Sequence, residues 1–139
     1  FSSPSMMNVT ATATGGTNNN YGVHNDSSSS PSMTDVTATA TGGTNNRGVY
    51  NYFSSPSMMN VTATATGGTN SDGVHNSWSS PSVRSSSFTG DDYSIYNTDT
   101  SSAQVADTML DGPVNAGLTC VGAYDETFVA LDEVCGFAP

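Results

Sequence analysis

The 139-residue chain has almost no positive charge. Lys and Arg together number 2 against 12 Asp and Glu, which gives a formal net charge of -10. A nucleic-acid-binding protein needs a basic surface to neutralise phosphates, so we expect no nucleic-acid partner, and an anionic membrane surface is disfavoured for the same reason. Charged residues are only 10% of the chain, so its polar character comes from Ser, Thr and Asn.

The chain also lacks a long apolar run and is poor in cysteine. No stretch approaches the roughly 20 apolar residues that a membrane-spanning helix needs, so we expect no membrane span. The two cysteines, Cys120 and Cys135, have no further ligands at short spacing, which favours a disulfide over a metal site. A disulfide here would contribute about 3 kcal/mol in the chain-entropy model and indicates a secreted, extracellular or cell-surface protein. We expect no cofactor.

A repeat dominates the rest of the sequence. The segment 6–17 (MMNVTATATGGT) recurs as 33–44 and again as 58–69. A period in the twenties that is kept this faithfully is typical of a solenoid. Within each unit, Val-Thr-Ala-Thr-Ala-Thr alternates strictly, which indicates a strand with one buried and one exposed face.

If the units stack in register, the buried side chains form continuous rows. Each row holds one side chain per turn, and the paired alanines predict a narrow interior. The predicted rows are Met6, Met33, Met58 and Val83; Val9, Val36 and Val61; Ala11, Ala38, Ala63 and Phe88; Ala13, Ala40 and Ala65; and, on the opposite wall, Val23, Val49, Val74 and Ile95.

Each unit is expected to hold about three short strands. In the first unit these are a strand around Ser5 that turns at Asn8, a strand from Val9 to Thr14, and a strand around Val23 that turns at Asn25. Asn and Gly tolerate the left-handed backbone that such corners require. We place the turns approximately at 1–30, 31–55, 56–80 and 81–102, followed by a terminal coil and C-terminal cap at 103–139.

The pattern Ser-Pro-x-Met-x-Asn-Val-Thr, followed by Gly-Gly and Gly-Val-Tyr-Asn, resembles the right-handed parallel β-helix repeats of secreted and surface bacterial proteins. The resemblance covers residues 1 to about 97 and implies an all-β, single-stranded parallel β-helix of four to five coils with about 25 residues each. Residues 120–135 resemble the C-terminal cap of some of these proteins. The fold alone does not imply a function, because it hosts lyases, hydrolases, adhesins and fibres.

Two repeated surfaces are candidates for an interaction. His24, Tyr50, His75 and Tyr96 occupy one slot in successive units and predict an exposed aromatic ladder. The two histidines would lie two turns apart, roughly 9.5 Å, which is too far to share a metal ion.

The second surface is a flat threonine lattice, which resembles the Thr-x-Thr arrays of β-solenoid antifreeze proteins. Its members are Thr10, Thr12, Thr14, Thr37, Thr39, Thr41, Thr62, Thr64 and Thr66. Threonine is also simply a good strand former, so the lattice does not require a ligand.

An enzymatic function has little support in the sequence. Asp91 and Asp92 are the only acidic pair in the repeat region and are the candidates for a degenerate carbohydrate-active enzyme, which would need paired carboxylates. Acidic residues are also common at turns. Asn8, Asn25 and Asn60 fit the glycosylation acceptor pattern, but ordinary turn asparagines fit it as well.

We therefore expect a non-enzymatic extracellular structural or surface module of the fibre, filament or adhesin-stalk type. Its partners would be further copies of itself or upstream repeats of the same polypeptide, because an uncovered first turn would offer open strand edges. Ice binding through the threonine lattice is the alternative, and a carbohydrate surface is a further candidate partner.

Overall fold

A computed structural model describes residues 2–136, which form two parallel β-sheets and contain no helix, and hence none that could cross a membrane. The nine-stranded sheet contains β1 (Ser5–Thr14), β3 (Ser32–Thr41), β5 (Ser57–Thr66), β7 (Ser82–Arg84), β8 (Ser87–Gly90), β10 (Ala103–Ala106), β11 (Met109–Asp111), β12 (Leu118–Val121) and β13 (Tyr124–Asp125). The four-stranded sheet has the order β2 (Asn19–Asn25), β4 (Asn45–Tyr52), β6 (Asn70–Ser77) and β9 (Tyr93–Thr98).

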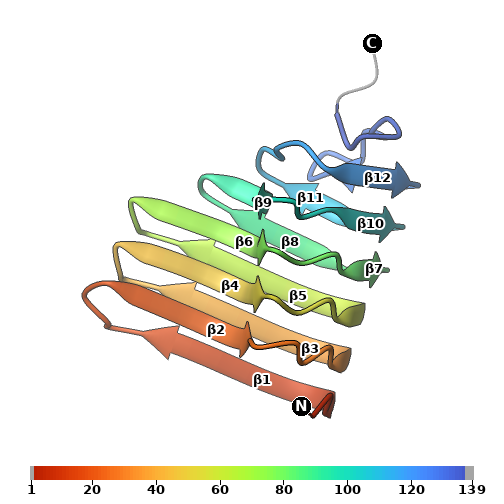
Figure 1. The fold of residues 1–139 in the computed structure, drawn as a ribbon. Helices are drawn as coiled ribbons and strands as arrows, with labels where there is room; N and C mark the ends of the chain where they lie inside the picture. Colours follow the sequence, from red (N-terminus) through yellow and green to blue (C-terminus); the bar gives the residue numbers. More distant parts are fainter. Residues whose placement is uncertain (1, 137–139) are drawn as a thin grey trace.

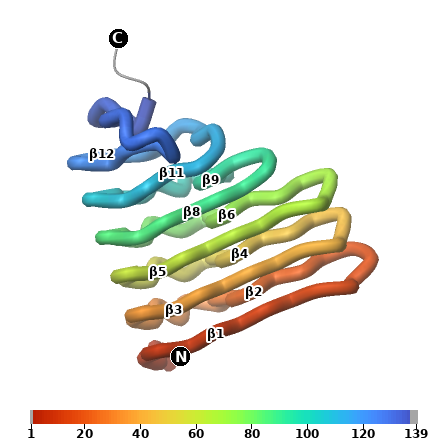
Figure 2. The backbone as a smooth tube through the Cα atoms, turned by 180° about the vertical axis from the view of Figure 1, so that it is seen from behind, coloured from red at the N-terminus to blue at the C-terminus, as the bar shows by residue number. Residues whose placement is uncertain are grey.

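The chain winds as a β-solenoid that climbs one strand spacing per turn (Figure 1). The strands of the four-stranded sheet lie nearer the viewer in Figure 1, and β1, β3 and β5 lie nearer in the reverse view of Figure 2, so the winding is right-handed. Ser32 pairs with Ser57 and Ser57 with Ser82, so a turn takes 25 residues in this part of the chain. This confirms the predicted fold.

The predicted register and the predicted inward rows are confirmed. Val9 pairs with Val36 and Val36 with Val61, and the alanine columns pair in the same way. The inward side chains of the second and third turns are at most 1% exposed: Met33, Val36, Ala38, Ala40, Val49, Met58, Val61, Ala63, Ala65 and Val74. The interior is therefore a filled core.

The prediction of three strands per turn was wrong for the first three turns. A single ten-residue strand replaces the first two, although Asn8 has the left-handed backbone expected at a corner, with φ of 55°. Asp35 and Asn60 occupy the same slot with φ of 54° and 53°. The bend is therefore real, but the ladder of backbone hydrogen bonds resumes directly after it.

Glycine fixes how closely the two sheets approach. A Cβ atom on Gly48 would lie 2.6 Å from the carbonyl oxygen of Gly73 and 2.7 Å from the backbone nitrogen of Thr64 on the opposite sheet. Gly22 and Gly73 likewise face backbone atoms of both sheets in the turn that follows each of them. Together with the alanine columns, these glycines make the solenoid flat.

A buried ladder of asparagine amides runs along the interior. Asn25 donates to Asn51 at 2.9 Å, Asn51 donates to Asn76 at 2.8 Å, and Asn76 donates to Asn97 at 2.9 Å. Asn25 was predicted to lie at a turn and also fits the glycosylation acceptor pattern. Its burial, at 5% exposed, makes it inaccessible to glycosylation in the folded chain.

The C-terminal end of the solenoid is covered. Cys120 and Cys135 form the predicted disulfide, with their Cα atoms 5.5 Å apart. The segment after β13 folds back over the last strands, since the Cys120 amide donates to the Glu133 carbonyl and the Leu131 amide to the Ala123 carbonyl. Before this cap, β10 and β11 continue the stack on β7 and β8.

Candidate functional surfaces

The outer face of β1, β3, β5 and β8, here called the Thr face, holds the predicted lattice. Its columns are in register: Thr10 with Thr37 and Thr62, Thr12 with Thr39 and Thr64, and Thr14 with Thr41 and Thr66. Thr89 extends the middle column to a fourth turn, which the sequence analysis did not include. All nine predicted threonines are exposed or half-buried.

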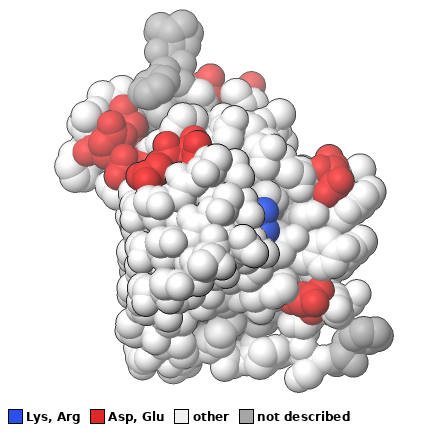
Figure 3. Space-filling model, turned by 90° about the vertical axis from the view of Figure 1, so that its left-hand side faces the viewer, with Lys and Arg blue, Asp and Glu red and all other residues white. Residues whose placement is uncertain are grey.

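The repeat region has little charge to repel a neighbouring surface. Nine of the 12 acidic residues follow Gly90, which leaves three acidic residues and two arginines in residues 1–90 and a net charge of 2 − 3 = −1. Figure 3 shows the side of the molecule that lies at the left in Figure 1, where loops connect the two sheets. Most of this surface is uncharged, and acidic groups are concentrated towards the C-terminal end.

The outer face of β2, β4, β6 and β9, here called the aromatic face, holds the predicted ladder. The ring centroids of His24 and Tyr50 lie 4.9 Å apart, those of Tyr50 and His75 lie 5.3 Å apart, and those of His75 and Tyr96 lie 5.0 Å apart. The prediction that every member is exposed was wrong for His75, which is only 6% exposed. His75 lies between the larger rings of Tyr50 and Tyr96, which cover it from both neighbouring strands.

His75 also has an acidic partner that sequence reasoning missed. Its Nδ1 atom lies 2.8 Å from Oδ2 of Asp72, which is 4% exposed. The signal was present in the alignment of units, because Asp72 stands in the column of Tyr21 and Arg47, where no other unit has a carboxylate. Asp72 and His75 are three residues apart, yet both lie on the outer face of β6. This is because the pairing of β4 with β6 omits Gly73, which lies between them.

Arg47 turns away from Asp72, although the two residues are paired across neighbouring strands. Its guanidinium donates to the Tyr21 hydroxyl at 3.2 Å and lies 4.3 Å from the centre of the Tyr50 ring. Burial raises the pKa of the Tyr50 hydroxyl, and the positive charge of Arg47 partly opposes this shift. Within residues 2–136 neither arginine forms a salt bridge, and the only contact between a carboxylate and a basic side chain is the hydrogen bond of Asp72 with His75.

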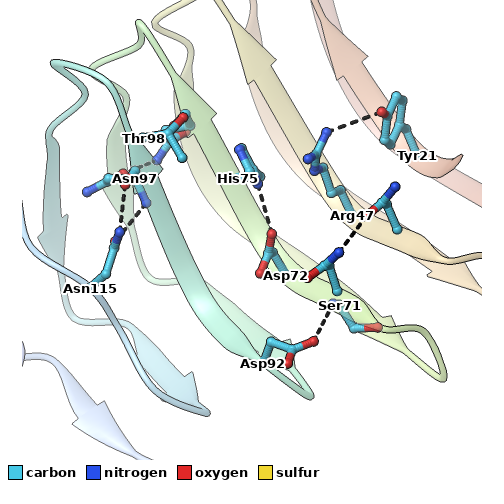
Figure 4. Close-up of polar contacts among 12 residues, drawn as sticks. Tyr21, Arg47, Ser71, Asp72, His75, Asp92, Asn97, Thr98 and Asn115 are labelled. Atoms are coloured by element: carbon cyan, nitrogen blue, oxygen red, sulfur yellow. Dashed lines mark hydrogen bonds and ion pairs between the residues drawn. The ribbon is translucent and has the colours of Figure 1, made fainter.

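This separation leaves a hollow of about 430 Å³ on the aromatic face. Asp72 and His75 line it from β6, Arg47 lines it from β4, and Tyr93 and Tyr96 line it from β9. Figure 4 shows Arg47 directed towards Tyr21 and Asp72 directed towards His75. The hollow exists because a short carboxylate stands between long side chains in its column.

Asp91 and Asp92, the acidic pair considered for catalysis, bind backbone amides of the preceding turn. Asp91 accepts a hydrogen bond from the Gly67 amide at 2.8 Å, and Asp92 accepts one from the Ser71 amide at 2.6 Å. Each carboxylate therefore uses one oxygen to fix a neighbouring loop. Only Asp92 also lines the hollow.

A further aromatic pair lies at the corner after the aromatic face. Phe53 and Trp78 stack with their rings nearly parallel, at 2°, and their centroids 5.7 Å apart. Both have the left-handed backbone, with φ of 48° and 53°, which is uncommon for bulky residues. Both side chains remain almost half exposed.

Comparison with known proteins adds no relative: no family model, no curated protein and no solved structure matches this chain.

Proposed function

We propose that this chain is a non-enzymatic extracellular structural module, a β-solenoid that associates through the open face of the turn that contains β1 and β2. The observation that carries the proposal is the difference between the two ends. The C-terminal end is covered by the disulfide-linked cap, whereas β1 and β2 each pair with a strand on one side only.

The open face presents core residues. Met6, Val9 and Ala11 are half-buried, whereas their equivalents one turn later are at most 1% exposed. Covering apolar surface gains about 25 cal/mol per Å², so a further turn of the same repeat stabilises this end.

The hydrogen-bonding groups of the open face also suit another turn of the same repeat. Each asparagine of the buried ladder donates to the next turn towards the C-terminus, so Asn25 Oδ1 is the acceptor end of the ladder. Unpaired strand edges are a template for a further strand. The near-neutral repeat region opposes this stacking only weakly.

Sedimentation equilibrium over a wide concentration range tests the proposal. We expect reversible association of the wild-type chain, which Met6→Lys abolishes because it places a charge in the stacking face. Met7→Lys is the matched control, since Met7 is 63% exposed and precedes the corner at Asn8, in a column that continues to Arg84 of β7. A strictly monomeric wild-type chain overturns the proposal. Loss of association in Met7→Lys alone assigns the contact to the outer surface before the corner and also overturns the proposal.

Ice binding is the second candidate function, and the in-register threonine lattice favours it. Parallel strands place hydroxyl groups about 4.7 Å apart between turns and about 6.6 Å apart along a strand. Thermal hysteresis is the assay. Thr39→Tyr, at the centre of the lattice, should abolish the activity, and Thr98→Tyr, outside the Thr face, should leave it unchanged. No hysteresis in the wild-type chain at high concentration removes this candidate.

A further inference from the structure

We propose that the hollow on the aromatic face binds a small hydroxylated amine, of the amino-sugar class, with the ammonium group at Asp72. Binding in this hollow is independent of the proposed association between chains, because the hollow lies on the outer face of β4, β6 and β9.

The hollow contains a buried carboxylate with bonding capacity to spare. Asp72 is 4% exposed and uses Oδ2 to accept from His75. Among the described residues no donor bonds its other oxygen, Oδ1, and its cross-strand neighbour Arg47 is held by two tyrosines instead. A carboxylate in this environment gains most from a ligand that brings its own charged donor, because charge-assisted hydrogen bonds are about twice as strong as neutral ones.

The other polar groups at the hollow are mainly acceptors. Asp92 uses Oδ2 to accept from the Ser71 amide, which leaves its Oδ1 without a donor among residues 2–136. Asn70 donates to Asn45 and keeps its own carbonyl oxygen for a ligand. Two carboxylates against one guanidinium give the hollow a net charge of −1 with His75 neutral. The site therefore favours a ligand that is cationic and rich in donors.

Two tyrosine rings would contact the hydrocarbon part of the ligand. The rings of Tyr93 and Tyr96 stack at 4.7 Å and form one side of the hollow. Aromatic faces attract an ammonium group and the C–H groups next to it. The volume of about 430 Å³ lies within the range of small-molecule sites and holds a molecule of monosaccharide size.

Titration calorimetry with three monosaccharide probes of similar size tests the assignment. Glucosamine carries the ammonium group, glucose replaces it with a hydroxyl, and glucuronate carries a negative charge. We expect glucosamine to bind at least tenfold more tightly than glucose, and we expect no binding of glucuronate. Equal affinity for glucose and glucosamine overturns the assignment of an amine, and no binding of glucosamine overturns the site.

Variants of the carboxylates locate the binding. Asp72→Asn keeps an acceptor for His75 but removes the charge, and it should reduce glucosamine affinity at least tenfold. Asp92→Asn, at the other carboxylate of the hollow, should weaken binding severalfold and tests the site if Asp72→Asn does not fold. Asp35→Asn is the matched control, because the same slot already holds Asn8 and Asn60 in other turns. Unchanged affinity in Asp72→Asn and Asp92→Asn, or an equal loss in Asp35→Asn, refutes the proposal.

Discussion

The buried asparagine ladder should be a main source of stability, and Asn51→Ala measures it. Asn51 is 0% exposed, accepts from Asn25 at 2.9 Å and donates to Asn76 at 2.8 Å. The substitution leaves one buried donor and one buried acceptor without this partner. At about 1–3 kcal/mol for each such group, the free energy of unfolding should fall by roughly 2–6 kcal/mol. Domains of this size have a total of about 5–15 kcal/mol.

Asn45→Ala is the matched control on the same strand. Asn45 donates to Asn19 at 2.8 Å and accepts from Asn70 at 2.7 Å, so it makes the same two bonds in a ladder on the surface. Water replaces the lost hydrogen-bond partners at the surface, so we expect the free energy of unfolding to fall by less than about 1 kcal/mol. Urea denaturation followed by circular dichroism measures both variants. Losses that agree within error would refute the reasoning, because burial would then have no effect.

Three further predictions follow from local contacts. Gly48→Ala should destabilise the chain by more than the usual ~1 kcal/mol of a point mutation, because the added Cβ meets backbone atoms of both sheets; thermal unfolding measures this. Cys120→Ser, which leaves Cys135 unpaired, should lower the unfolding free energy by about 3 kcal/mol in denaturant titrations. The Val129 amide, more than any other group, lowers the pKa of Asp125; the resulting stabilisation is therefore present above the unfolded-state pKa, near 4, and lost as the pH falls below it. Amide protection factors in the cap, which correct for the intrinsic pH dependence of exchange, should fall over that range in the wild-type chain but not in Asp125→Asn.

The inward rows could be predicted from the sequence because alternation and period act together. A strand fixes which side chains share a face, and a constant repeat length fixes which residues stack, so Val36 had to lie between Val9 and Val61. The same reasoning predicted the lattice of the Thr face. The location, the absence of enzymatic activity and the partners remain predictions, because a repeat pattern constrains shape and says little about ligands.

The buried polar groups could not be predicted in this way. Asn25 and Asn51 are of a residue type that is common at turns. Only the stacked structure shows that their side-chain amides form a hydrogen bond inside the core. The hollow was missed for a different reason. It arises from Asp72, a single departure from the repeat, and a search for shared features passes over the position where one unit differs from the others.

The loss of the repeat after the third turn is part of how the solenoid ends. Turn length falls from 25 residues to 22 between Ser82 and Gln104, and to 15 between Ala103 and Leu118. Phe88 takes the column of Ala63, so a larger side chain fills the interior as the turns become shorter. A perfectly repeated sequence would present the same open strand edges at every turn, including the last. The irregular C-terminal turns let the chain cover the last strands of the stack, whereas β1 and β2 each keep one unpaired side among the described strands.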